Sequence, residues 1–226
     1  VSGTGDLRAE NLELLSEGIS FTAVCGGENA HVHLPIPGKF TVYNALTVLG
    51  VALQLGISLA DCAEALKSAS GVKGRVEVVP TPGKDYTILI DYAHTPDALE
   101  NVLNTVKEIN KSGKTICVVG CGGNRDKGKR PMMAKIAVKM SDEVFFTADN
   151  PRDEEVKDII NDMLAGLSED EQMNVTCIED RKEAILEACN VAEKGDVVLI
   201  AGKGHETYQE IKGVKYHFDD KEIILK

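Results

Sequence analysis

The stretch TICVVGCGGNRDKGKRPMMAKIAVKM, residues 115–140, decides the fold of this chain. A mostly apolar run, 115–119, leads into a glycine-rich turn, and a segment with helical spacing of apolar residues follows it. A strand, a loop and a helix in this order make up the repeating unit of a parallel sheet. The same unit is therefore expected on both sides of this stretch.

Further copies of the unit occur from Asp85 onward. Runs typical of buried strands occupy 87–91, 115–120, 143–147, 175–178 and 196–200, and helical patterns lie near 97–111, 130–140, 153–167 and 181–193. Continuous apolar strands joined by helices predict an α/β fold: a Rossmann-like, mostly parallel sheet with helices on both faces. A hairpin around Gly213 and a short last helix are expected to complete this part.

The residues before this α/β part have a different pattern. Alternating residues at 19–24 and 31–34, on either side of Gly26–Gly27, predict a hairpin, and two helices are expected at 41–55 and 58–69. We place a domain boundary near Arg75, which gives domains at 1–74 and 75–226. His31 and His33 share one strand face, and without a third ligand nearby a solvated face is favoured over a metal site.

Composition excludes several classes of partner. A net charge of −11 would repel a phosphate backbone, and aromatic residues make up only 4% of the chain, so no nucleic acid is expected. No apolar run approaches the ~18 residues of a membrane span, and no export signal is recognised, so we expect a cytoplasmic protein without membrane contact. We also expect a monomer.

The glycine-rich turn nearly spells a phosphate-binding P-loop. Arg130 stands where the GxxxxGK motif continues with Ser or Thr, so the hydroxyl that holds Mg²⁺ is missing. The dinucleotide fingerprint GxGxxG fails at Arg125, which disfavours a nicotinamide dehydrogenase. We expect this loop to hold a substrate carboxylate, with Arg125 as a planar, bidentate donor.

Four polar loops follow strands of the predicted sheet. They begin at Asp91, Gly120, Asp149 and Ala201, and the carboxyl ends of parallel strands meet at one edge. Each loop also has a purely structural interpretation, because Thr95-Pro96 and Asp149-Asn150-Pro151 are good helix starts. Together they predict a pocket for an anion and an amine, with these side chains at one edge of the sheet: Asp91, His94, Arg125, Arg130, Asn150, Arg152, Lys203, His205 and Glu206.

Six ordered motifs carry a family resemblance. GKFTVYNALTVLG, GRVEVV, DYAHTPDALENVL, GCGGNRDKGKRPMM, DNPR and AGKGHE, from Gly38 onward, resemble the Mur ligases of peptidoglycan synthesis. The resemblance implies that 1–74 is the end of a central, ATP-binding domain and that 75–226 is the carboxyl-terminal, Rossmann-like domain. The family's P-loop, its Mg²⁺ ligands and its carbamylated lysine have no counterpart here. We therefore expect an excised piece that is inactive alone and holds neither a catalytic residue nor a metal ligand.

The resemblance also implies a reaction and roles for single residues. ATP, with Mg²⁺, phosphorylates the D-glutamate γ-carboxylate of UDP-MurNAc-L-Ala-D-Glu, and the amine of the incoming amino acid attacks the acyl phosphate. Asn44, Arg75 and Asp91 match ATP-binding positions, and His94 and Lys129 match lesser contacts. Thr41 departs from the family, which usually has asparagine there. The positions that hold the added amino acid, meso-diaminopimelate, match Arg125, Asp149, Asn150, Pro151, Arg152, Gly202 and Glu206.

The choice of amino acid depends on Arg152. Lysine-adding relatives carry a different residue at this position, and lysine lacks the distal carboxylate that diaminopimelate has. We expect DNPR to open a helix, and lysine to leave the guanidinium of Arg152 unpaired at a cost of about 2–5 kcal/mol. The alternatives are a lysine-adding ligase, a ligase similar to folylpolyglutamate synthase, which lacks the DNPR and GKGHE pattern, and a non-catalytic module that binds nucleotides or carboxylates.

Overall fold

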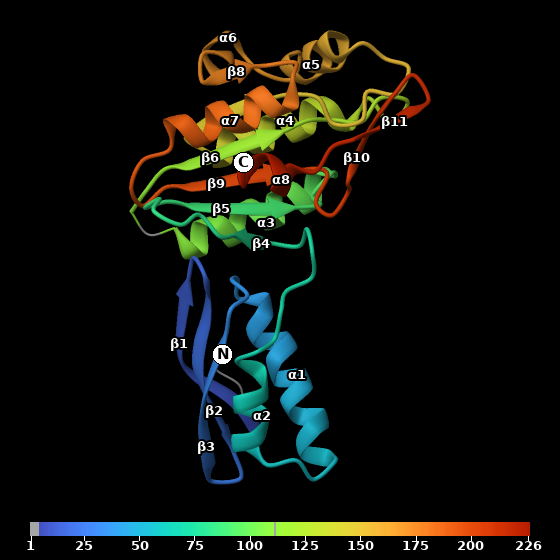
Figure 1. The fold of residues 1–226 in the computed structure, drawn as a ribbon. Helices are drawn as coiled ribbons and strands as arrows, with labels where there is room; N and C mark the ends of the chain where they lie inside the picture. Colours follow the sequence, from blue (N-terminus) through green and yellow to red (C-terminus); the bar gives the residue numbers. More distant parts are fainter. Residues whose placement is uncertain (1–4, 111) are drawn as a thin grey trace. The chain divides into compact units, whose positions relative to one another are not determined.

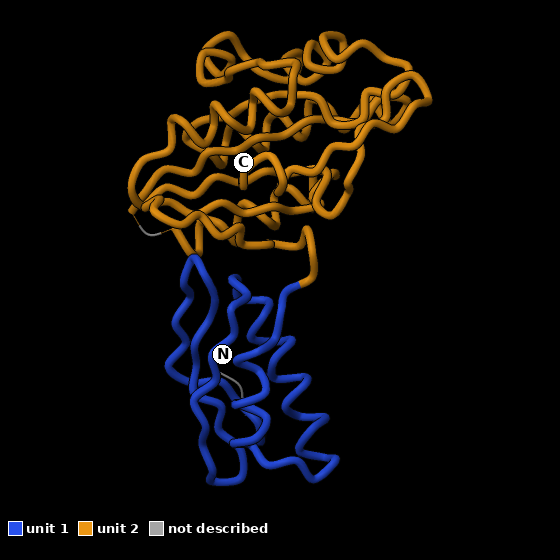
Figure 2. The backbone as a smooth tube through the Cα atoms, in the orientation of Figure 1, with its two compact units in different colours: residues 1–71 blue, residues 72–226 orange. Residues whose placement is uncertain are grey.

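The computed structural model describes residues 5–110 and 112–226. The chain divides into two compact units between Gly71 and Val72, close to the boundary expected near Arg75 (Figure 2). Each unit has its own hydrophobic core and is described by itself. In the described residues, no helix is both long and apolar enough to cross a membrane.

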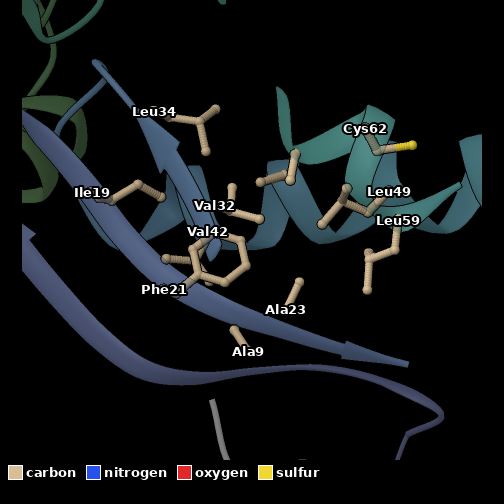
Figure 3. Packing of buried hydrophobic residues seen from close by; sticks show 12 residues of the cluster. Ala9, Ile19, Phe21, Ala23, Val32, Leu34, Val42, Leu49, Leu59 and Cys62 are labelled. Atoms are coloured by element: carbon tan, nitrogen blue, oxygen red, sulfur yellow. The ribbon is translucent and has the colours of Figure 1, made fainter. Parts of the chain in front are cut away.

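The first unit is a three-stranded antiparallel sheet covered by two helices. The strands β1 (Leu7–Leu15), β2 (Gly18–Cys25) and β3 (Glu28–Leu34) lie in chain order, and α1 (Phe40–Gln54) and α2 (Leu59–Leu66) follow. Figure 3 shows Phe21 and Val32 of the sheet packed towards Val42 and Leu49 of α1. Burial of these apolar side chains drives the unit together.

The predicted hairpin and both helices of this unit are confirmed, whereas β1 was missed. The pairing of β1 with β2 shifts register between Glu10 and Glu13, and Asn11 lies in the left-handed region with φ 52°. Such a bulge interrupts the alternation of apolar and polar residues by which a strand is recognised. His33 accepts or donates a hydrogen bond with Ser20 across the sheet (Nδ1–Oγ 3.0 Å), and His31 is exposed.

The second unit is an α/β domain around a six-stranded sheet, as predicted (Figure 1). Its strand order is β4-β5-β9-β6-β7-β8, and every neighbouring pair is parallel except β4 with β5. The strands are β4 (Glu77–Val79), β5 (Thr87–Asp91), β6 (Thr115–Val119), β7 (Glu143–Phe146), β8 (Val175–Cys177) and β9 (Val197–Ala201).

Helices cover both faces of this sheet. Ala184, Ile185 and Ala188 of one helix pack on the face formed by Ile88, Val118, Val198 and their neighbours, and α3 and α4 contact the sheet from the other side. Alternate residues of the strands are equally buried, which is why the strands read as continuous apolar runs. The helices are α3 (Pro96–Ile109), α4 (Lys129–Met140), α5 (Val156–Leu164), α6 (Glu169–Gln172), α7 (Arg181–Val191) and α8 (Asp220–Ile224).

Two features differ from the expected pattern of helices. Helix α5 begins at Val156 rather than near residue 153, so the DNPR segment does not open it, and α6 was not predicted. The hairpin of β10 (Tyr208–Ile211) and β11 (Val214–His217) is present, with Gly213 at φ 78° in its turn.

The strand order brings four loops to one edge. Because β9 is the last strand of the sheet in the sequence but lies between β5 and β6, the loops after β5, β6, β7 and β9 are neighbours in space. In Figure 1 the arrowheads of β5, β6 and β9 point towards the edge at which the hairpin β10–β11 lies. Such a switch in strand order is where ligands bind to parallel sheets.

Candidate amino-acid pocket

The four loops enclose a cavity of about 380 Å³ at the carboxyl edge of the sheet. This volume suits a small polar molecule. Residues of all four loops line it: Tyr92, His94, Thr95, Gly122, Arg125, Asp126, Lys129, Arg152, Gly202 and Glu206. Six of these were predicted site residues, namely His94, Arg125, Lys129, Arg152, Gly202 and Glu206.

The loop after β6 supplies fewer free cations than its sequence suggested. Arg130 is completely buried and donates to Glu154 (2.9 Å) and Asp162 (2.7 Å), so its expected place in the pocket was wrong. Lys127 also pairs with Glu154 (3.1 Å). The Arg130 guanidinium, with a backbone N–H and Lys127, lowers the pKa of Glu154 to about 2. Glu154 thereby fixes the loop and neutralises part of its charge.

Arg125 and Lys129 remain as the cations of this loop that face the cavity. Arg125 is exposed, and among the described residues its guanidinium donates only to the carbonyl of Asn124, from Nη1 (3.3 Å). The Nζ of Lys129 donates to the carbonyl of His94 (2.7 Å), which ties the loop after β6 to the loop after β5. Arg125 is thus free to contact an anion in the cavity.

Arg152 has a backbone conformation that few arginines adopt. Its φ is 51°, in the left-handed region, and it forms an isolated bridge with Ile211. Its N–H donates to the carbonyl of Glu210 (3.0 Å), and its own carbonyl accepts from the N–H of Lys212 (2.7 Å). The hairpin therefore holds the residue in a conformation that costs about 1 kcal/mol or more, and strain of this kind gathers at binding sites.

The guanidinium of Arg152 lies at the wall of the cavity. Its Nη1 donates to the carbonyl of Gly123 (2.9 Å), and its Nε lies 3.3 Å from Oε2 of Glu210. Within residues 5–110 and 112–226, Nη2 has no hydrogen-bond partner. A carboxylate in the cavity can accept from this nitrogen.

A hydrogen-bonded cluster at the wall of the cavity consists of Asn150, Lys203 and Glu206. Lys203, which is completely buried, donates from Nζ to Asn150 Oδ1 and to Glu206 Oε2, both at 3.1 Å. Asn150 Nδ2 donates to the same carboxylate oxygen (2.9 Å), and Asn150 Oδ1 also accepts from the N–H of Glu210 (2.9 Å). Asn150 thus orients its neighbours, and Oε1 of Glu206 is left for a ligand.

Asp149, Pro151 and Gly202 lie where the loops after β6, β7 and β9 meet. Asp149 is buried, accepts from the N–H of Asn150 (2.6 Å), and would lie 2.8 Å from a Cβ placed on Gly202. Gly202 has a φ of 114°, so a side chain there is excluded by conformation as well as by space. The carbonyl of Pro151 packs against Gly123 so closely that a Cβ on that glycine would overlap it.

The residues matched to ATP positions are divided between the two units. Arg75 is exposed, with its guanidinium 5.0 Å from the centre of the Tyr92 ring, and Asp91 is buried. The Asp91 carboxylate accepts from the N–H groups of Val76 and Ala93, each at 2.8 Å. Burial raises its pKa, against the lowering effect of these donors and of Arg75. Asn44 is exposed on α1 of the first unit, and the ATP contacts of all three residues stay predictions.

Arg181, which the sequence analysis did not identify, is a buried cation that holds the loops after β7 and β9. Arg181, the first residue of α7, donates to both carboxylate oxygens of Asp220 (2.8 Å each) and to the carbonyls of Ala148 and Ala201. These carbonyls immediately precede Asp149 and Gly202. Nothing in the local pattern of residues 181–191 distinguishes this arginine from a solvated one.

Magnesium does not fit the described part of the chain. No group of three or more His, Cys, Asp and Glu side chains among residues 5–110 and 112–226 is arranged to hold a metal ion. A Mg²⁺ ion needs several oxygen ligands in octahedral geometry. The chemistry proposed below for this chain therefore involves no step at a metal.

Comparisons with known proteins agree on one family. A family profile described as "Mur ligase, glutamate ligase domain" matches residues 74–204. The UDP-N-acetylmuramoyl-L-alanyl-D-glutamate--2,6-diaminopimelate ligase of Phocaeicola vulgatus is 55% identical over 197 residues, which are 87% of this chain and 40% of the relative. The enzyme of the same name from Bacillus licheniformis is 47% identical over all 226 residues and 45% of its own length.

Solved structures give the same picture. A structure of a UDP-N-acetylmuramoyl-L-alanyl-D-glutamate--2,6-diaminopimelate ligase aligns with a TM-score of 0.80 at 37% identity, over 100% of this chain and 45% of that one. A folylpolyglutamate synthase from Thermotoga maritima aligns with a TM-score of 0.68 at 22% identity, over 87% of this chain and 44% of that one, which shows a shared fold alone. The chain spans less than half the length of the relatives described here.

Proposed function

Because the chain belongs to the Mur ligase family, we propose that it is the amino-acid-binding part of an ATP-dependent ligase. In this proposal the ligase adds meso-2,6-diaminopimelate to the D-glutamate γ-carboxylate of UDP-MurNAc-L-Ala-D-Glu, a step of peptidoglycan precursor synthesis. The names of the relatives at 47–55% identity support this substrate set. ATP and the UDP-sugar are then its other partners, and we expect the reaction to take place in the cytoplasm on a monomer.

The proposal depends on one observation: Arg152 and Glu206 both line the same cavity. One end of diaminopimelate is a carbon that bears both a carboxylate and an ammonium group. The Arg152 guanidinium can donate to that carboxylate, and the free oxygen of Glu206, with a backbone carbonyl near Gly202, can accept from that ammonium. Asp149, Asn150 and Pro151 shape and orient this pocket, and Arg125 provides a further cation for a carboxylate.

The chemistry follows from holding the far end of the amino acid. Phosphorylation of the γ-carboxylate gives an acyl phosphate, whose carbonyl carbon the near amine of diaminopimelate attacks. The C–N bond forms, the amine loses a proton, and the tetrahedral intermediate expels inorganic phosphate. The part of this chain is to fix the nucleophile in place, because a bound, oriented amine reacts far faster than a free one. Arg75 and Asp91 would contact ATP, and His94 and Lys129 would make lesser contacts in the pocket.

A chimaeric enzyme tests the proposal. These 226 residues replace the aligned part of the Bacillus licheniformis relative, with which they align over their whole length. Arg152→Ala should raise the Michaelis constant for diaminopimelate about 100-fold or more, because a charge-assisted hydrogen bond of about 3 kcal/mol is lost. The Michaelis constant for ATP should change little.

The matched control is Arg8→Ala, which removes an exposed arginine of β1. This variant should leave both Michaelis constants unchanged. Unchanged diaminopimelate kinetics in Arg152→Ala, or efficient use of L-lysine by the unaltered chimaera, contradicts the proposed specificity and favours the lysine-adding alternative.

A further inference from the structure

Glu210 contacts the same guanidinium that is expected to bind the distal carboxylate of the substrate. Its Oε2 lies 3.3 Å from Nε of Arg152, and both side chains are largely shielded from solvent, with 26% and 19% exposure. Glu210 did not stand out in the sequence, because it lies in a hairpin strand without motif character. The contact matters because it gives Arg152 a negatively charged partner even when no substrate is bound.

The position of Glu210 is fixed by its backbone. Its N–H donates to Asn150 Oδ1 (2.9 Å), and its carbonyl accepts from the N–H of Arg152 (3.0 Å). Neither bond involves the carboxylate. The side chain is therefore presented to the guanidinium by main-chain bonds that a glutamine at this position would keep.

We propose that Glu210 is a specificity-determining residue that limits discrimination between amino acids with and without a distal carboxylate. The inference rests on the proposed function of the pocket. Glu210 partners Arg152 whichever amino acid is bound, so it determines how much the guanidinium gains from a substrate carboxylate.

Two effects act in the same direction. When an amino acid such as lysine is bound, Glu210 keeps the guanidinium paired, which removes most of the penalty for an unpaired buried charge. When diaminopimelate is bound, the carboxylates of Glu210 and of the substrate share one guanidinium and repel each other. The first effect favours lysine and the second disfavours diaminopimelate, so discrimination is smaller than for an unpaired Arg152.

Glu210→Gln removes the charge and keeps the shape. With lysine bound, the described residues then offer Arg152 only uncharged acceptors such as the carbonyl of Gly123, whereas diaminopimelate supplies a carboxylate. The ratio of the lysine to the diaminopimelate dissociation constant should rise about tenfold. Glu155→Gln is the matched control, because Glu155 is an exposed acid that pairs with Lys212 at the turn of the same hairpin.

The test is an NMR titration of the 226-residue chain, labelled with ¹⁵N at arginine, with meso-diaminopimelate and with L-lysine. The Nε–H resonance of Arg152 is assigned by its loss in Arg152→Lys. Without amino acid, this resonance should differ between the unaltered chain and Glu210→Gln and be the same in Glu155→Gln. With amino acid, the ratio of dissociation constants should rise in Glu210→Gln alone.

The outcomes separate this inference from the proposed function. If the unaltered chain favours diaminopimelate and Glu210→Gln leaves the ratio unchanged or lowers it, the inference is wrong and the proposed function stands. An Arg152 resonance that is insensitive to Glu210→Gln also refutes it. If lysine binds more tightly than diaminopimelate, the proposed specificity fails and the inference fails with it. If neither amino acid binds to the isolated chain, the same titration is made with the chimaera, and an absence of binding there contradicts the proposed function.

Discussion

Replacing Arg152 by glycine should cost less stability than replacing it by alanine. At φ 51° a side chain meets its own backbone, whereas glycine adopts this conformation without strain. In a helix the order is the opposite, because glycine is about 1 kcal/mol worse than alanine there. The sign of the difference therefore reports the backbone conformation at this position.

The magnitude follows from the contacts of the residue. Both variants lose the hydrogen bond from Nη1 to Gly123 and the contact with Glu210, which together stabilise the unit by about 1–3 kcal/mol. Alanine keeps a left-handed strain of about 1–2 kcal/mol that glycine lacks. The larger entropy of the unfolded glycine chain offsets about 0.4–1 kcal/mol of this gain. Arg152→Gly should therefore be more stable than Arg152→Ala by about 0.5–1 kcal/mol.

The assay is urea unfolding of the 226-residue chain, followed by the amide resonances of Val198 and Leu199. Both residues are completely buried in β9, so they report on the second unit alone. The free energy of unfolding comes from the midpoint and slope of each transition. An alanine variant that is more stable than the glycine variant would show that residue 152 does not have a positive φ, and the hairpin would then not hold Arg152 as described.

Three further predictions concern the loops around the pocket. Because the pKa of Glu154 is about 2 against an ordinary 4.5, its interactions with Arg130, the N–H of Asn124 and Lys127 together stabilise the fold above pH 4.5 by about 2–3 kcal/mol. This contribution is lost as the pH falls towards 2. Glu154→Gln should flatten that part of the stability curve in an acid titration, and an unchanged curve refutes the pairing. Lys203→Met should lower the free energy of unfolding by about 3 kcal/mol, because the Glu206 carboxylate loses its buried partner. Adding Glu206→Gln in a double-mutant cycle should restore much of this loss. Strictly additive effects of the two changes would show that the two charges do not interact. Gly123→Ala should lower the free energy of unfolding by more than about 2 kcal/mol in thermal melts, because its Cβ overlaps a carbonyl of the facing loop, and a neutral effect would contradict that close approach.

The fold of the second unit follows from the sequence because its strands are buried on both faces. The runs at 87–91 and 115–120 contain the unbroken apolar stretches 88–90 and 116–119, which distinguish them from the polar loops and the periodic helices around them. The first strand of the first unit could not be read in this way, because the bulge near Asn11 interrupts its alternation.

The sequence predicted those pocket residues that follow directly from the order of the strands and loops. Motifs at the carboxyl ends of strands identified Arg152 and Glu206, and the cavity brings them together. Local charge counting failed for Arg130, since its partner Glu154 lies in another loop. The expected helix at DNPR failed for the same reason: a bridge to Ile211, far along the chain, fixes the backbone of Arg152.

The most direct test of the proposed function is a competition between two amino acids. The chimaera with the Bacillus licheniformis relative receives ATP, Mg²⁺, UDP-MurNAc-L-Ala-D-Glu and equal concentrations of meso-diaminopimelate and L-lysine, and mass spectrometry identifies the product. A pocket in which Arg152 contacts a carboxylate and Glu206 contacts an ammonium predicts that the diaminopimelate product dominates, and that Arg152→Ala removes this preference. A dominant lysine product, or a preference that survives Arg152→Ala, would contradict the account.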